Sequence, residues 1–139
     1  MVKSLLFSGL GGFFGTIARL LVTRYLQENY QSVFPLGTLA VNVLGCLIIG
    51  LVYGISEQGE IFNANVRLFL TVGFCGGFTT YSSFSNDSLL LLRQQEWWRM
   101  ATYSTLSFVL CLIAVFTGSS SVPAHVEMMG LIGMGNNPM

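Results

Sequence analysis

The stretch "VGFCGGFTTYSSFSND", residues Val72–Asp87, lies where the chain is expected to form a transmembrane helix. It combines glycines with a dense series of hydroxyl side chains and with aromatic rings. Irregular backbone at membrane depth is tolerated only where it is buried in protein or lines a cavity, and interrupted helices then offer backbone groups to ions. The stretch therefore predicts a helix break that binds an ion or substrate. A continuous helix with its glycines at a tight crossing is the alternative.

The composition of the whole chain is typical of a membrane protein. Of its 139 residues, 53% are hydrophobic and 9% are charged, which is far from the soluble average. A spanning helix needs roughly 20 mostly apolar residues. The uncharged runs therefore predict an all-α integral membrane protein with four transmembrane helices, near residues 4–26, 36–56, 66–92 and 98–117. We expect residues 1–118 to form this domain and 119–139 to form a polar C-terminal tail.

The charged residues are few and evenly spread. The formal net charge is zero and no basic patch exists, so nucleic acid is not an expected partner. If the helices alternate in direction, one membrane face holds Lys3 and Arg67, and the other holds Arg24, Arg93 and Arg99. Orientation follows an excess of Lys and Arg on one side, and this bias is weak. Such a chain can insert both ways up, which makes an antiparallel homodimer a candidate assembly.

Small residues and one arginine stand out in the first apolar run. Gly11 and Gly15 in "GLGGFFG" have the spacing that lets helix backbones approach closely in lipid. Arg19 lies well inside the same run. Its side chain either extends to the interface or pairs with a structural partner such as a carbonyl or Asn42.

Polar side chains recur at helical spacing in the second and fourth runs. Thr38 and Asn42 share one helix face, and the Asn42 amide is costly in hydrocarbon unless it finds partners. Asn42 therefore either joins helices or lines a polar path. A second stripe, made of hydrogen-bonding side chains or pathway residues, comprises Tyr103, Ser107 and Cys111.

The three cysteines lie in apolar runs and form no CxxC pair. We interpret Cys46, Cys75 and Cys111 as small packing residues rather than as a disulfide framework or a metal site.

An aromatic pair and a carboxylate end the opening stretch. Tyr81 and Phe84 are three residues apart, so their rings lie along one helix face. Aromatic rings have a positive edge that can solvate a small anion, although packing or an interfacial position is the common role. We expect Asp87 to lie near the far interface or to pair with a neighbouring donor.

With these motifs placed, the chain resembles the Fluc (CrcB) family of small fluoride channels. The resemblance rests on "GGFFGTIAR" (11–19), "PLGTLAVNVLG" (35–45) and "GFCGGFTTYSSFSND" (73–87). It implies a dual-topology antiparallel homodimer with two fluoride pathways in the cell membrane, the plasma or inner membrane of a bacterium. It also implies passive fluoride export that lowers cytoplasmic fluoride, with a structural sodium ion at the dimer centre and membrane lipid around it.

The resemblance implies site residues one by one. The sodium ion would be held by the backbone carbonyls of Gly76 and Thr79. The fluoride pathway would include Thr38, Asn42, Tyr81, Phe84, Tyr103, Ser107 and Cys111. The chain departs from the family pattern at Tyr81, where Phe is usual, and at Cys111, where a serine is common and the thiol is a poorer donor.

A small four-helix proton-coupled multidrug exporter is the alternative. Such a carrier needs a membrane-embedded carboxylate, and the first helix has none. The remaining candidate is Asp87, which lies beyond the aromatic pair. An enzyme is not expected, because no pairing of a nucleophile with a base is visible and the single histidine, His125, lies in the tail.

Overall fold

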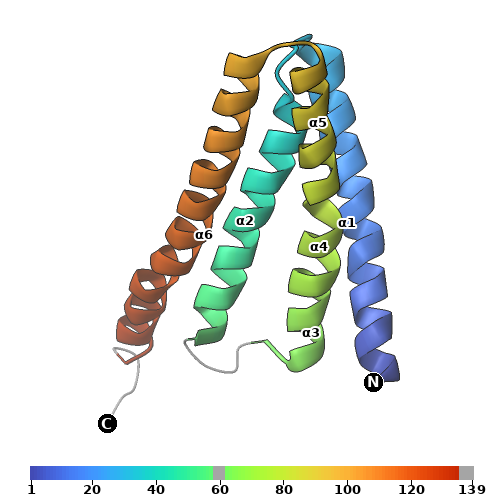
Figure 1. The fold of residues 1–139 in the computed structure, drawn as a ribbon. Helices are drawn as coiled ribbons and strands as arrows, with labels where there is room; N and C mark the ends of the chain where they lie inside the picture. The colour runs from blue at the N-terminus through green and yellow to red at the C-terminus, as the bar shows by residue number, and fades with distance from the viewer. Residues whose placement is uncertain (58–61, 135–139) are drawn as a thin grey trace.

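The computed structural model describes residues 1–57 and 62–134, with residues 123–134 described by their backbone alone. Helices run side by side in a bundle, and these described residues contain no β-strand (Figure 1). Three helices are long and apolar enough to cross a membrane: α1 (Val2–Asn29), α2 (Leu36–Glu57) and the Trp97–Val122 part of α6 (Trp97–Met134). The prediction of an all-α protein with apolar spans is confirmed.

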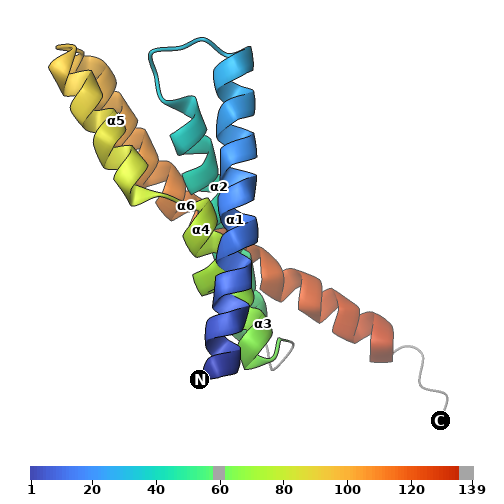
Figure 2. The same cartoon turned by 90° about the vertical axis from the view of Figure 1, so that its right-hand side faces the viewer.

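The third apolar segment consists of several shorter elements. They are α3 (Ala64–Leu68), the π-helix η1 (Phe69–Cys75), α4 (Gly76–Phe78) and α5 (Tyr81–Arg93). Thr79 and Thr80 have extended backbone, with ψ angles of 157° and 113°. These two residues separate α4 from α5, and α5 leans away from α1 while α4 lies beside it (Figure 2).

Glycines set the contact between α1 and the first half of this segment. A Cβ atom at Gly11 would overlap the carbonyl oxygen of Phe69 and lie 2.8 Å from the Phe74 nitrogen. From the other side, a Cβ atom at Gly77 would lie 2.6 Å from the carbonyl oxygen of Gly12. Gly11 and Gly15 are both buried. The close approach predicted from their spacing is therefore present, and it is an approach of backbone to backbone.

A second close contact joins α2 to α6, which lie against each other. A Cβ atom at Gly118 would lie 2.6 Å from the carbonyl oxygen of Leu47, and one at Gly54 would lie 2.8 Å from that of Ser119. The molecule thus contains two tightly joined helix pairs, α1 with η1 and α4, and α2 with α6.

Helix α6 extends beyond the end that we predicted near residue 117. Its backbone remains helical to Met134, through residues 119–134 of the predicted tail; residues 135–139 lie outside the described part. The serine run after Gly118 does not end the helix, because serine hydroxyls can bond back to helix carbonyls. Ser119 Oγ donates to the Phe116 carbonyl, and Ser121 Oγ donates to the Gly118 carbonyl, each at 3.1 Å.

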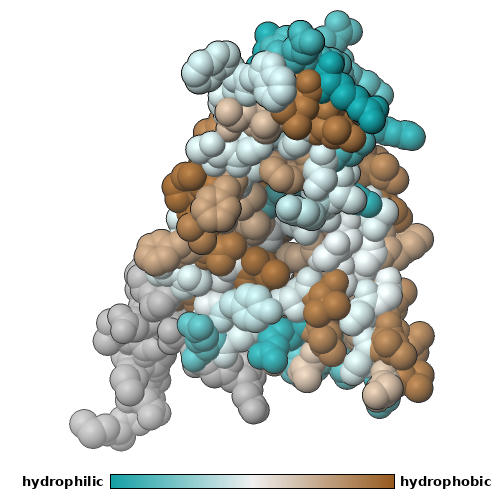
Figure 3. Space-filling view, in the orientation of Figure 1, coloured by the Kyte–Doolittle hydropathy of each residue, from teal (hydrophilic) through white to brown (hydrophobic). Residues whose placement is uncertain are grey.

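Much of the apolar surface is exposed in the single chain. Phe13, Phe108 and Leu112 are 60%, 72% and 61% exposed. On the face seen in Figure 3, hydrophilic residues gather towards the two ends and hydrophobic residues lie between them. Contiguous exposed apolar surface of this kind marks a membrane or protein contact. Lipid or a second subunit is therefore expected to cover it.

Candidate functional site

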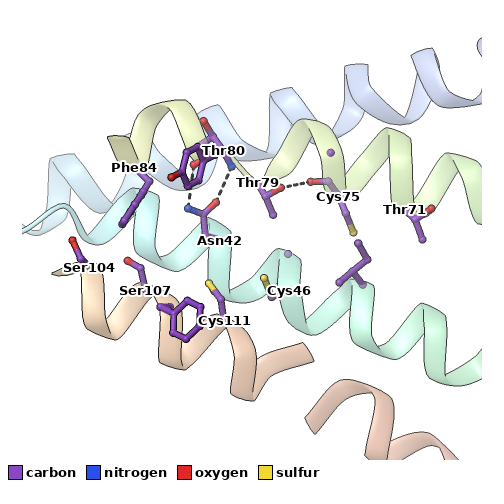
Figure 4. A pocket seen from close by; sticks show the side chains of 15 residues that line it. Asn42, Cys46, Thr71, Cys75, Thr79, Thr80, Phe84, Ser104, Ser107 and Cys111 are labelled. Atoms are coloured by element: carbon purple, nitrogen blue, oxygen red, sulfur yellow. Dashed lines mark hydrogen bonds between the residues drawn. The ribbon is translucent and has the colours of Figure 1, made fainter. Parts of the chain in front are cut away.

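The main cavity lies between α2, the third apolar segment and α6 (Figure 4). Its volume is about 400 Å³. Both residues expected to bind sodium, Gly76 and Thr79, line it. So do five of the seven residues expected along the fluoride pathway, namely Asn42, Tyr81, Phe84, Ser107 and Cys111. The fold therefore brings most of the predicted site residues together.

The Asn42 side chain bonds to the backbone of Thr80 in both directions. Its Oδ1 accepts from the Thr80 N–H at 2.7 Å, and its Nδ2 donates to the Thr80 carbonyl at 3.2 Å (Figure 4). In a continuous α-helix the Thr80 N–H would donate to the carbonyl of Gly76. Asn42 has taken that donor, so the Gly76 carbonyl lacks its helical partner.

This geometry bears on two alternatives that the sequence left open. Asn42 joins α2 to the third apolar segment, and it also lines the cavity. An amide carries two N–H groups, so one of them is outside these bonds and able to meet a ligand. Both hydrogen bonds recorded for the amide go to Thr80, which does not support the pairing with Arg19.

Most hydroxyl groups after the glycines bond locally. Thr80 Oγ1 accepts from the Ser83 N–H at 3.2 Å and bonds Ser83 Oγ at 3.1 Å. Thr79 Oγ1 donates to the Cys75 carbonyl at 2.8 Å. Thr80 thereby caps the start of α5, whereas the Thr79 hydroxyl adds a second donor to a carbonyl that already accepts from the Thr79 N–H at 2.9 Å. Such hydroxyls stabilise the interruption and leave less capacity for a ligand.

Ser107 is different, because its side chain is buried and has no partner. Its relative exposure is 7%, and among the described residues its Oγ makes no hydrogen bond. Leaving a buried donor unpaired costs about 1–3 kcal/mol. Ser107 also lines the cavity, so its hydroxyl is a free donor at this site.

A chain of aromatic rings begins at the cavity. The rings of Tyr81 and Phe84 lie 5.6 Å apart, those of Phe84 and Tyr103 5.2 Å, and those of Tyr103 and Phe34 5.5 Å. Tyr81 is 80% exposed in the single chain, whereas Tyr103 is fully buried. The two rings predicted to share a helix face do so, and both residues line the cavity.

Two expected pathway residues, Thr38 and Tyr103, do not line the main cavity. Thr38 lines a smaller cavity of about 110 Å³, together with Asp87. The Tyr103 hydroxyl donates to the Asp87 carboxylate at 3.3 Å. Asp87 thus pairs with a donor on α6, one of the two outcomes that we expected for it. Thr38 and Asp87 belong to a polar region separate from the main cavity.

Several further residues line the main cavity and were not predicted, and those with hydroxyl or thiol side chains are Cys46, Thr71, Cys75, Thr80 and Ser104. Helical spacing could have indicated two of them, because Cys46 follows Asn42 by four residues and Ser104 precedes Ser107 by three. The described part of the chain contains no group of three or more His, Cys, Asp or Glu residues able to hold a metal ion. A cation here would need backbone or hydroxyl oxygens.

Comparison with known proteins agrees with this architecture. The family model described as "CrcB-like protein, Camphor Resistance (CrcB)" matches residues 6–119, and a model described as "GGGtGRT protein" matches only 109–139. A "Fluoride-specific ion channel FluC" of Phocaeicola vulgatus is 44% identical over 117 residues, 84% of this chain and 96% of the relative.

Two further relatives carry the same name. That of Shewanella loihica is 36% identical over 90% of this chain and 100% of the relative. That of Flavobacterium psychrophilum is 37% identical over 84% of this chain and 94% of the relative. With three helices able to span a bilayer, these matches indicate a multi-pass membrane protein. The chain belongs to the CrcB family.

Proposed function

We propose that this protein is a fluoride-selective channel through which fluoride leaves the cell passively, lowering cytoplasmic fluoride. The unpartnered hydroxyl of Ser107 in the main cavity carries the proposal. A buried donor without an acceptor is suited to an anion that arrives from water. The names of the relatives give the anion as fluoride.

The cavity provides donors without a fixed cationic side chain. Fluoride is small and strongly hydrated, so a channel must replace its water shell while still releasing the ion. The Ser107 hydroxyl, the remaining N–H of Asn42 and the ring edge of Phe84 are able to do this. None of the described residues that line the cavity is lysine or arginine, either of which would retain the anion.

A structural sodium ion is part of the proposal. The carbonyls of Gly76 and Thr79 would hold it, and two observations fit this role. Asn42 has taken the helical donor of the Gly76 carbonyl, and Thr79 has extended backbone, so neither carbonyl has the partner that a continuous helix would supply. A bound cation would supply a fixed positive charge beside an anion path.

We also propose an antiparallel homodimer in the bacterial plasma or inner membrane. Gly76 and Tyr81 line the cavity yet are exposed in the single chain, so another subunit could complete the walls. The weak charge bias between the two faces allows opposite insertion of two copies. Each copy would contribute one pathway.

The geometry favours the channel over a proton-coupled multidrug exporter. An exporter of that kind needs a carboxylate in its binding cavity. No Asp or Glu is among the described lining residues of the main cavity, and Asp87 is bonded to Tyr103 outside it.

Fluoride efflux from liposomes that contain the purified protein tests the proposal. A fluoride electrode would follow release, with matched chloride-loaded liposomes and protein-free liposomes as controls. We expect rapid fluoride release and no comparable chloride release. Efflux equal to that of empty liposomes, or equal passage of chloride, would overturn the channel assignment.

A further inference from the structure

All three cysteines of the chain line the main cavity, and they come from three different elements. Cys46 lies on α2, Cys75 on η1 and Cys111 on α6. All three are free thiols; Cys75 is buried, while Cys46 and Cys111 are half-buried. The sequence spacing gave no reason to group them, because the residues are far apart along the chain.

Cys46 and Cys111 form a pair within this group. Both residues line the main cavity, from two helices that lie against each other. Figure 4 shows their sulfur atoms on the cavity side, between α2 and α6. The helices that carry them are held together at Gly50, Gly54 and Gly118, where a side chain would meet the backbone of the opposite helix. The two sulfur atoms are therefore presented by a fixed helix pair.

We propose that the thiols of Cys46 and Cys111 form a binding site for a thiophilic metal ion that takes two sulfur ligands, with Hg²⁺ as the probe. Sulfur ligands select soft metal ions. On binding, each S–H bond breaks, two Hg–S bonds form and two protons pass to water, with no change in oxidation state. The product, one divalent ion with two thiolates, is electrically neutral.

Neutrality favours this class of ion in an apolar site, because an uncompensated buried charge is costly. A monovalent soft ion with two thiolates would leave a net negative charge. Zinc is less suited, since its structural sites use four ligands and the described residues provide no such group.

A metal ion at this pair would lie in the same cavity as the unpartnered Ser107 hydroxyl, which is one helical turn before Cys111. We therefore expect bound Hg²⁺ to block fluoride passage. That consequence rests on the proposed function, whereas binding of the metal does not.

Thiol titration of the full-length Cys75→Ser variant tests the binding site directly. This variant keeps only Cys46 and Cys111. We expect one equivalent of HgCl₂ to remove both free thiols, and denaturing mass spectrometry to show one chain plus one mercury minus two hydrogens. Two mercury ions on one chain, or one mercury joining two chains, would overturn the paired site.

Single-thiol variants provide the matched control. In the Cys75→Ser background, Cys46→Ser and Cys111→Ser each leave one thiol. A second thiol held in place acts at high effective concentration, so removing mercury from the pair should need roughly tenfold or more competing glutathione than removing it from either single thiol. Equal retention by paired and single-thiol proteins would contradict the proposal.

Efflux measurements then test the block. HgCl₂ should stop fluoride release by the wild-type protein, and excess dithiothreitol should restore it. The Cys46→Ser variant should recover its efflux at roughly tenfold less competing glutathione than the wild-type protein needs. If the wild-type protein binds mercury in the paired manner but never releases fluoride, the proposed function fails while the metal site stands. If mercury binds in the paired manner but efflux is undiminished, the metal site stands and the expected block of fluoride passage is wrong.

Discussion

The two halves of the third apolar segment are held by different means. Before Thr79, η1 and α4 lie against α1, and the contact is made by glycine backbones. After Thr80, α5 lies against α6, where the contact is made by side chains, including the rings of Phe84 and Tyr103 and the bond from Tyr103 to Asp87. At Gly11, Gly73 and Gly77 the contact of the first half has no space for a methyl group, because a Cβ atom there would meet backbone of the opposite helix. Thr79 and Thr80 therefore connect a rigid half, η1 and α4, which is fixed by backbone contacts, to a side-chain half, α5, which is held by side-chain contacts.

The largest effect is expected from adding one methyl group to the rigid half. The substitution Gly11→Ala places a Cβ atom against the Phe69 carbonyl and 2.8 Å from the Phe74 nitrogen. Overpacking of this kind lowers the free energy of unfolding by about 1–3 kcal/mol, and more where only backbone could move. Thermal unfolding in detergent would measure the loss.

Gly9→Ala is the matched control, because a Cβ atom at Gly9 has no atom within 4 Å. Alanine favours helix over glycine by up to about 1 kcal/mol, so this variant should be as stable as the wild type or more so. If both variants unfold alike, the backbone contact is not the main support of this half.

The next largest effect is expected from breaking the contact between Asn42 and Thr80, where the two halves meet. Asn42→Ala removes both bonds to Thr80 and leaves the Thr80 N–H without an acceptor. Unpaired buried groups cost about 1–3 kcal/mol each, so stability should fall, and fluoride efflux should fall with it. Efflux from liposomes and unfolding in detergent measure the two losses.

Thr38→Val provides the comparison on the same face of α2, one turn earlier. Thr38 lines the smaller cavity rather than the main one. Its substitution should therefore reduce efflux less than Asn42→Ala does. The opposite ranking would move the anion path away from the main cavity.

A substitution on α6, in the lining of the main cavity, should affect conduction without lowering stability. Ser107→Ala removes a buried hydroxyl that has no partner in the described part of the chain, so the free energy of unfolding should stay the same or rise by about 1 kcal/mol. Loss of one donor to the ion should slow efflux by about tenfold, the equivalent of 1.4 kcal/mol. Reduced stability with normal efflux would show that Ser107 has a structural role instead.

The smallest effect is expected at Asp87. Asp87→Asn retains an oxygen that can accept from the Tyr103 hydroxyl, and Asp87 lies outside the main cavity. Fluoride efflux should stay within about twofold of the wild-type rate, equivalent to about 0.4 kcal/mol, because the hydrogen bond is kept and the main cavity is unchanged. Complete loss of transport, restricted to conditions with a proton gradient, would favour the exporter.

The sequence was most informative about what one segment does by itself. Apolar runs predicted the helices, the spacing of Gly11 and Gly15 predicted a buried small-residue face, and that of Tyr81 and Phe84 predicted neighbouring rings. Each of these features depends on helical periodicity alone. Spacing also singled out some of the cavity residues before their neighbours were known, namely Asn42, Tyr81, Phe84, Ser107 and Cys111, whereas Gly76 and Thr79 were implied only by the family resemblance.

Contacts between segments were harder to predict, because periodicity identifies a face and not what it meets. Its spacing allowed Asn42 to be a helix contact or a pathway residue, and the structure shows that it bonds to Thr80 and also lines the cavity. Likewise, periodicity does not predict that Cys46 and Cys111, which lie on different helices, line the same cavity. The prediction that the last helix ends near residue 117 was wrong. The serines after Gly118 indicated a polar tail, whereas the Ser119 and Ser121 hydroxyls bond to carbonyls within the helix.

The bonds between Asn42 and Thr80 also constrain how the protein is assembled. The partners are 38 residues apart, and they belong to segments that enter the membrane one after the other. Without α2 beside it, the extended backbone at Thr80 would meet lipid with unsatisfied polar groups, which is costly. We expect residues 66–92 to insert poorly alone and well when residues 36–56 precede them, a difference that glycosylation-tag insertion assays can measure. Asn42 would thus favour membrane insertion of the segment that follows it during synthesis.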